Sequence, residues 1–295
     1  MSDHDLSAGA DVLDRVTRFA GRAAVAHGCH PGSTVRLLNV SENATFLIED
    51  PDEGPSVLRV HRLGYHTATE IASELAWMDA LRAEAGVRTP RVLPVAGGRR
   101  MLGLPDEAAG SSGPAQPRGL RYCVRFEYLP GTEPADDDVA HFAELGEITA
   151  RMHRHARQWA RPSWFTRFCW DYDAAFGRAA RWGRWQDGIG VGPAEREVLG
   201  RLDRVLATRL ANLLVDRGRV SVIDFDDSGF SWFLYDAGTS VSFFEHQPQV
   251  PELVDSWLTG YRRVLPLPAA DEAEIWTFIM FRRLLLVAWI GSHQG

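Results

Sequence analysis

Residues 212–227, NLLVDRGRVSVIDFDD, hold the side chains whose types and spacing best suit a chemical role. A two-residue turn at Arg217-Gly218 would fold this stretch into a hairpin and place Asn212 opposite Ile223, beside Asp224. An amide oxygen and a carboxylate then meet at the open end of the hairpin. Hard oxygen ligands of this kind suit Mg²⁺, which keeps part of its water shell and takes further ligands from phosphates. The stretch is therefore a candidate metal site formed by Asn212 and Asp224.

A plainer interpretation of the same stretch is an ordinary hairpin whose polar ends form turns. For Asn212 alone, that interpretation is the better one. Three carboxylates, Asp224, Asp226 and Asp227, follow a strand of buried type, and this density favours the metal site. A metal-dependent hydrolase built on these three carboxylates is a further alternative, although it lacks the histidine ligands that such sites usually have.

The segment VIDFDDSGFSWFLYD, residues 222–236, resembles the aminoglycoside phosphotransferase and choline kinase family, which has a protein-kinase-like fold. The most similar branch includes bacterial stress-response Ser/Thr kinases and type II homoserine kinases, and the resemblance extends over most of the chain. It implies transfer of the γ-phosphoryl group of ATP to a hydroxyl, with Mg²⁺ held by Asp224 and Asn212. It also implies that Asp236 is a buried aspartate that braces the catalytic loop, a role compatible with a plain helix N-cap.

Two charged residues in the first half match the same family. Arg59, in the strand Val57–Val60, stands where the family has a strand Lys or Arg that contacts the α- and β-phosphates; a guanidinium can do this with two parallel hydrogen bonds. Glu74 follows Ile71 by three residues, on the edge of an apolar helical stripe, and resembles the helix glutamate that pairs with the strand base. Each residue alone is more typical of a solvated surface charge. Only the two together, in this order along the chain, support the resemblance to the family.

Two further stretches are expected to contact the nucleotide. Asn39-Val-Ser-Glu-Asn-Ala44 has no G-x-G-x-x-G pattern, but related families also use small polar residues here. The backbone amides around Ser41 and Asn43 are therefore expected to cradle phosphate. Glu127-Tyr128-Leu129 resembles the hinge, where the backbone of Glu127 and Leu129 would bind adenine, and a simple linker between lobes is the alternative.

The sequence departs from the family at the catalytic base. These kinases carry an aspartate in a pattern close to H-x-D-x-x-x-x-N, and it accepts the proton of the attacking hydroxyl. Counting back five residues from Asn212 gives Ala207, and the histidine position holds Val205. The pattern predicts that a strand and its H-x-D were lost between about 206 and 208. Asp203 is the nearest carboxylate, but it lies on a predicted helix and is a weak substitute.

The hydrophobic pattern predicts strands in the first half and helices in the second. The expected strands are 35–38, 45–49, 56–61 and 122–128, with a hairpin of 91–95 and 99–104. The expected helices are 11–26, 67–84, 142–159, 194–207, 236–246, 251–263 and 271–290, with short helices within 163–189. This order predicts an α+β, two-lobed, protein-kinase-like fold. Its antiparallel β lobe with one main helix would span 1–128 and bind nucleotide, and its mostly helical lobe would span 129–295.

The composition limits which partners the protein is expected to bind and in which compartment it is expected to work. The net charge of −7 argues against a nucleic-acid or membrane-surface partner. Cys29, Cys123 and Cys169 form no C-x-x-C pattern, which favours a reducing cytoplasm over a secreted scaffold. The apolar stretch 275–290 is interrupted by Arg282-Arg283 and is expected to be a core helix and not a membrane span.

The sequence thus predicts an ATP- and Mg²⁺-dependent phosphotransferase whose acceptor is a hydroxyl of a small molecule or of a protein Ser/Thr. Activity is expected to be impaired because the base is absent. The rival hypothesis is a nucleotide-binding pseudokinase or deletion remnant. Two secondary signals favour structure over chemistry: His153 and His155 would point to different faces of one helix, and the cluster of Trp164, Trp170, Trp182 and Trp185 is more typical of a core than of a substrate surface.

Overall fold

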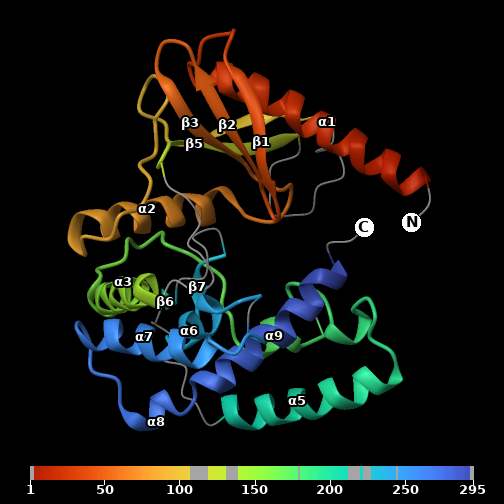
Figure 1. Ribbon diagram of the computed structural model, residues 1–295. Coiled ribbons are helices and arrows are strands. Elements are labelled where there is room, and N and C mark those ends of the chain that lie inside the picture. Colours follow the sequence, from red (N-terminus) through yellow and green to blue (C-terminus); the bar gives the residue numbers. More distant parts are fainter. Residues whose placement is uncertain are drawn as a thin grey trace. The chain divides into compact units, whose positions relative to one another are not determined.

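The computed structural model describes residues 3–106, 119–130, 139–178, 180–211, 220–221, 227–243 and 245–292. The chain divides into two compact units (Figure 1). The N-terminal unit comprises Met1–Asp79, Arg88–Gly131 and Trp164–Thr166. The C-terminal unit comprises Ala80–Val87, Thr132–Ser163 and Arg167–Gly295.

The described residues of the N-terminal unit form a five-stranded antiparallel sheet in the order β1-β2-β3-β5-β4 (Figure 1). Its strands are β1 (Thr34–Val40), β2 (Ala44–Asp50), β3 (Gly54–Val60), β4 (Leu102–Pro105) and β5 (Leu120–Glu127). The turn between β2 and β3 is stabilised by Asp50, whose Oδ1 accepts hydrogen bonds from the backbone amides of Asp52 and Glu53. The strands predicted at 35–38, 45–49, 56–61 and 122–128 are confirmed, with small shifts at their ends.

The hairpin predicted from 91–95 and 99–104 is wrong in its pairing. The turn exists, because Gly97 and Gly98 have positive φ angles and the Gly98 amide donates to the Val95 carbonyl. However, Val92 bridges Phe126 of β5, and Leu102 of β4 pairs with Cys123 further along β5. Both segments therefore lie along one edge of β5 and pair with it, and the bond that joins them directly is at the turn, where the Val95 amide donates to the Arg99 carbonyl.

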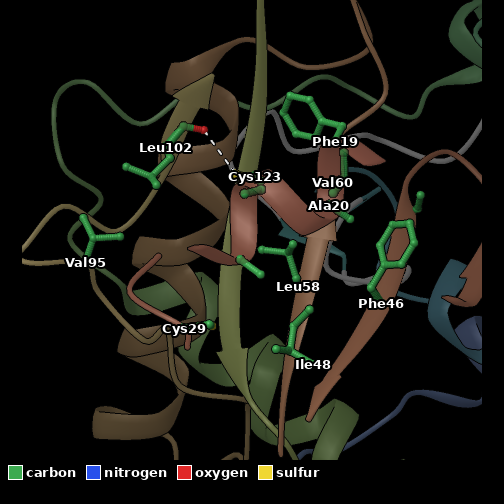
Figure 2. Packing of buried hydrophobic residues seen from close by; sticks show 13 residues of the cluster. Phe19, Ala20, Cys29, Phe46, Ile48, Leu58, Val60, Val95, Leu102 and Cys123 are labelled. Carbon is green, nitrogen blue, oxygen red and sulfur yellow. Dashed lines mark hydrogen bonds between the residues drawn. The ribbon is translucent and has the colours of Figure 1, made fainter. Parts of the chain in front are cut away.

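Helix α1 (Asp3–Ala26) packs on one face of this sheet. Phe19 and Ala20 meet a layer of alternate strand residues, and Figure 2 shows these side chains gathered around Cys123. The layer consists of Phe46 and Ile48 from β2, Leu58 and Val60 from β3, and Cys123 from β5. Since successive strand residues point to opposite faces, Arg59 is directed to the other face.

Helix α2 (Ala68–Glu84) begins with a capping box. Thr67 Oγ1 accepts a hydrogen bond from the Glu70 amide, and Glu70 Oε2 accepts one from the Thr67 amide at 2.7 Å. Burial raises the pKa of Glu70, but hydrogen bonds from His66 and Thr67 outweigh it and lower this pKa to about 2. The charged carboxylate therefore fixes the point at which the helix starts.

The C-terminal unit is mainly helical in its described part. Its elements are α3 (Val139–Gln158), α4 (Tyr172–Phe176), the 3-10 helix η2 (Trp185–Asp187), α5 (Pro193–Ala211), β6 (Val220–Ser221), β7 (Gly229–Phe230), α6 (Tyr235–Ser240), α7 (Val250–Arg262), α8 (Ala269–Glu272) and α9 (Ile275–Ser292). The helix predicted over 271–290 is thus two helices, and the one predicted over 236–246 ends at Ser240. Helix α5 runs past the predicted end at 207.

Aromatic residues form much of one core in this unit. Trp170, Trp182 and Trp185 are buried beside Phe281 and Leu285 of α9, which confirms that these tryptophans are core residues. Trp164, in the N-terminal unit, is half exposed. Helix α9 is a core helix as predicted, and within the described residues no helix is long and apolar enough to span a bilayer.

Two glycines allow α3 and α7 to pack closely. A Cβ atom on Gly146 of α3 would lie 1.9 Å from the Trp257 carbonyl oxygen, and one on Gly260 of α7 would lie 1.7 Å from the Ala143 carbonyl oxygen. Neither backbone can move away without separating the helices. The core between them, which includes Trp257 and Leu253, therefore depends on glycine at both positions.

We expect Gly260→Ala to lower the free energy of unfolding by about 3 kcal/mol, since overpacking of a tight contact typically costs about 1–3 kcal/mol and here the obstacle is backbone. Gly200→Ala in α5 is the matched control, because its Cβ would find its nearest neighbour at an ordinary 3.7 Å. It should be neutral or stabilising by up to about 1 kcal/mol. Urea denaturation measures both, and equal effects would contradict the close-packing account.

Candidate functional site

Arg59 and Glu74 form a buried ion pair in the N-terminal unit. Arg59 projects from β3 on the face opposite the α1 core, and Glu74 projects from α2. Arg59 Nη1 donates to Glu74 Oε1 at 2.6 Å, and the side chains are 16% and 0% exposed. The guanidinium also lies 5.0 Å from the centre of the Phe126 ring, a contact that the sequence reasoning did not anticipate. The structure thus brings together the two residues that the sequence paired.

The Glu74 carboxylate has a second oxygen, Oε2, that is buried and has no hydrogen-bond partner among the described residues. A buried carboxylate with one charged contact holds its cationic partner strongly, because little water screens the pair. The pair therefore fixes the Arg59 guanidinium on the sheet. A guanidinium carries five N–H donors in a rigid fork, which is the geometry that phosphate oxygens accept.

The predicted phosphate loop joins β1 to β2 and is internally bonded. The Ser41 amide donates to the Asn43 carbonyl at 3.0 Å, and the Asn43 side-chain oxygen accepts from the Arg62 amide at 3.0 Å. Asn43 is buried. Its side chain therefore ties this loop to the residues after β3, and the Ser41 amide is already engaged within the turn. Any binding of phosphate by this loop would involve its other amides.

The predicted hinge continues from the end of β5. The Glu127 amide donates to the Arg91 carbonyl, and Glu127 Oε1 accepts from the Arg91 amide, each at 2.9 Å. These two bonds hold Glu127 in an extended conformation against the segment that precedes β4. Leu129 lies beyond the strand and is partly exposed. A role for either residue toward adenine stays a prediction.

The two predicted metal ligands, Asn212 and Asp224, and their neighbour Asp226 lie outside the described residues, as does most of the predicted hairpin. Its described part, β6, pairs antiparallel with β7, with Val220 opposite Phe230. Asp227, the last of the three carboxylates, is described, and it is buried. Within the described parts of the chain, no group of three or more His, Cys, Asp or Glu side chains could hold a metal ion.

Asp236 is buried in the first turn of α6, as the resemblance implied, and its carboxylate contacts α3. Asp236 Oδ2 lies 2.8 Å from Nε2 of His153. Burial, reinforced by Arg157, lowers the pKa of His153 to about 3, so the imidazole is neutral near pH 7. Because the carboxylate can only accept, His153 carries its proton on Nε2. His155 instead bonds Glu84 at 3.0 Å, and these separate partners agree with the prediction that the two histidines point to different faces of the helix.

Ala207 stands at the position that the sequence pattern predicts for the catalytic base, and its side chain has no acidic group. Ala207 lies inside α5, which continues to Ala211. Asp203, four residues earlier, accepts hydrogen bonds from the hydroxyl of Tyr172 and from Nε1 of Trp185, the latter at 3.2 Å. Burial and the Asp203 carboxylate raise the pKa of Tyr172, so this hydroxyl stays protonated and remains a donor. Asp203 is therefore engaged as a structural acceptor.

The phosphotransferase enzyme family matches residues 34–273, and the chain belongs to this family. A microcompartment-associated aminopropanol kinase of known structure is 42% identical in sequence to this chain, with a TM-score of 0.80. The match covers 94% of this chain and 89% of that one. Amicoumacin kinase hAmiN, in complex with AMP-PNP, Ca²⁺ and Ami, shares the fold at 22% identity and a TM-score of 0.73, with 95% and 88% covered. Amicoumacin kinase of Bacillus subtilis (strain 168) is 24% identical over 88% of this chain and 80% of that protein.

These findings confirm the family and the two-lobed, α+β, protein-kinase-like fold predicted from the sequence. The particular branch, with stress-response and homoserine kinases, stays a prediction. The roles assigned to Arg59, Glu74, Glu127 and the metal ligands are likewise carried forward as proposals.

We expect Glu74→Gln to lower the free energy of unfolding by about 2–3 kcal/mol, because it removes the charge of the buried carboxylate that pairs with Arg59. Asp79→Asn is a matched control on the same helix. Asp79 pairs with Arg100 at the same 2.6 Å, but both side chains are more than one third exposed. That exposed pair should contribute less than about 1 kcal/mol. Urea denaturation of both variants is the measurement, and similar losses would show that burial does not strengthen the Arg59–Glu74 pair.

Proposed function

We propose that this protein transfers the γ-phosphoryl group of ATP to the hydroxyl of a small molecule. One observation carries the proposal: 42% identity over 94% of the chain with an aminopropanol kinase. An amino alcohol such as aminopropanol is therefore the first acceptor to test. A protein Ser/Thr acceptor has no comparable support and serves as a second class in the same test.

The N-terminal unit would hold the nucleotide. Arg59 would donate to the α- and β-phosphates, and its ion pair with Glu74 holds the guanidinium in place. The backbone of Glu127 and Leu129 would hydrogen-bond adenine. The loop at Ser41 and Asn43 would lie near the phosphates with its conformation set by the Asn43–Arg62 bond.

The C-terminal unit would hold the metal through Asn212 and Asp224, whose hard oxygen atoms fit a divalent cation of the Mg²⁺ type. When bound, Mg²⁺ neutralises charge on the phosphate oxygens during transfer. A bound divalent ion is compatible with the AMP-PNP and Ca²⁺ reported for amicoumacin kinase hAmiN. In our proposal the protein contributes position and charge, while proton acceptance from the attacking hydroxyl has no residue assigned to it.

We propose further that this chain is impaired in transfer. Ala207 occupies the position of the base, and Asp203 is held by Tyr172 and Trp185. The alternative function, a nucleotide-binding pseudokinase, is favoured by the same observation. The two differ in whether any phosphoryl group reaches an acceptor.

A general base typically contributes about 10²–10⁴-fold to rate. We therefore expect transfer to be at least on the order of 10²-fold slower than in a repaired variant, in which a relative's strand and H-x-D segment are inserted after Leu206. The measurement is ADP release and acceptor phosphorylation on a panel of amino alcohols, sugars and Ser/Thr peptides. Equal turnover by both chains would mean that another residue is the base. No turnover by the repaired chain on any acceptor would contradict the phosphotransferase proposal.

A further inference from the structure

One face of helix α1 borders a hollow in the N-terminal unit that is rich in arginine. The hollow has a volume of about 420 Å³ and is lined by Arg15, Arg18, Phe19, Gly21, Arg22 and Asp106. The three arginines follow one another at spacings of three and four residues, so their side chains share one face of the helix. All three are exposed. The protein thus gathers three positive charges around one hollow, although its net charge is −7.

These three arginines form no ion pair with a carboxylate in the described part of the chain. Asp106, the acidic residue of the hollow, pairs with Arg121 of β5, so its charge is already balanced. Asp14, one turn before Arg18, is exposed and does not pair with it. Arg22 Nη2 donates to a backbone carbonyl at 3.2 Å, an acceptor without a charge. Because like charges one turn apart destabilise a helix, an anion bound in the hollow would relieve this repulsion.

Gly21 leaves space in this hollow. It lies inside α1, where glycine destabilises a helix relative to alanine. Close packing does not require it, because a Cβ atom at this position would have no heavy atom within 4 Å. Since Gly21 lines the hollow, a longer side chain there would extend into the space beside the arginines. The missing side chain therefore keeps room for a ligand.

The hollow is separate from the Arg59–Glu74 pair. Phe19 belongs to the core between α1 and the sheet, and the guanidinium groups of Arg22 and Arg121 lie 5.6 and 5.7 Å from the centre of its ring. Arg59 projects from the opposite face of the same sheet. An anion in the hollow would therefore not occupy the place proposed for the phosphates of ATP.

We propose that this hollow is a second anion site, which binds a soluble small molecule that carries a phosphate or diphosphate group. Guanidinium groups present N–H donors in pairs that match phosphate oxygens, and three of them suit an anion with more than one negative charge. The volume lies within the range of about 300–1,000 Å³ that is usual for small-molecule pockets. A concave site of this size favours a small ligand over a lipid surface. The inference does not rest on the proposed function, because it uses no residue assigned to ATP or to the metal.

The test is calorimetric titration of the full chain with inorganic pyrophosphate in the presence of EDTA. The parent should bind pyrophosphate, and the double variant Arg15→Gln/Arg18→Gln should bind it on the order of tenfold more weakly, the change typical of a lost hydrogen bond between charged groups. Arg36→Gln/Arg88→Gln is the matched control, since both arginines are exposed in the same unit and lie outside the hollow. It should leave the affinity unchanged.

Three results of this titration overturn the inference. They are no binding of pyrophosphate by the parent, equal losses in the two double variants, and full binding by Arg15→Gln/Arg18→Gln. The last result would place the anion elsewhere, such as at Arg59, and would leave the proposed function standing.

A second pair of variants tests the hollow itself, apart from its charge. Gly21→Leu should fold at least as well as the parent, because leucine favours a helix more than glycine does. It should nevertheless weaken pyrophosphate binding, because its side chain fills the hollow. Ala26→Leu adds the same side chain at an exposed position of α1 outside the hollow and should leave binding unchanged. Equal binding by Gly21→Leu and the parent overturns the inference.

Vesicles that contain phosphatidic acid separate a soluble ligand from a lipid headgroup, since both carry the same phosphate chemistry. The account predicts that the chain binds free pyrophosphate and does not sediment with these vesicles. Sedimentation with the vesicles, without binding of free pyrophosphate, would assign the arginines of α1 to a lipid surface and overturn the inference.

Discussion

The ion pair between Arg59 and Glu74 joins the central strand β3 to helix α2 and places one positive charge at a fixed point of the N-terminal unit. Alternation along β3 makes this possible, since Leu58 and Val60 fill the α1 core while Arg59 points the other way. The capping box at Thr67 and Glu70 then sets where α2 begins, and so where Glu74 lies on it. A local helix signal and a strand alternation thus combine to form one non-local contact.

In the C-terminal unit, the equivalent organisation comes from polar contacts across tightly packed helices. Gly146 and Gly260 let α3 and α7 approach, which brings Tyr261 within hydrogen-bond distance of His153. His153 in turn holds Asp236 at the start of α6. A change at the contact between α3 and α7 would therefore reach Asp236 through this histidine.

Sequence patterns predicted the structural features that depend on residues close together in the chain or on a strict periodicity. The strands around Arg59 follow from the alternation of side chains at every second residue. The buried position of Glu74 follows from its place beside the apolar stripe of a helix. The pairing of residues 91–93 with β5 was missed, because it is decided by which edge the rest of the sheet leaves open. The bond from Arg62 to Asn43 and the contact of Tyr172 with Asp203 join residues 19 and 31 positions apart, and no motif records either.

The central claim is that this chain is built to hold ATP together with a divalent metal, whatever its rate of transfer. Calorimetric titration of ATP, once with Mg²⁺ and once with EDTA, tests it most directly when Asp224→Ala is measured beside the parent chain. The account predicts that the parent binds ATP more tightly with Mg²⁺ and that Asp224→Ala loses this difference. Equal affinity of the parent for ATP in the two conditions would contradict it.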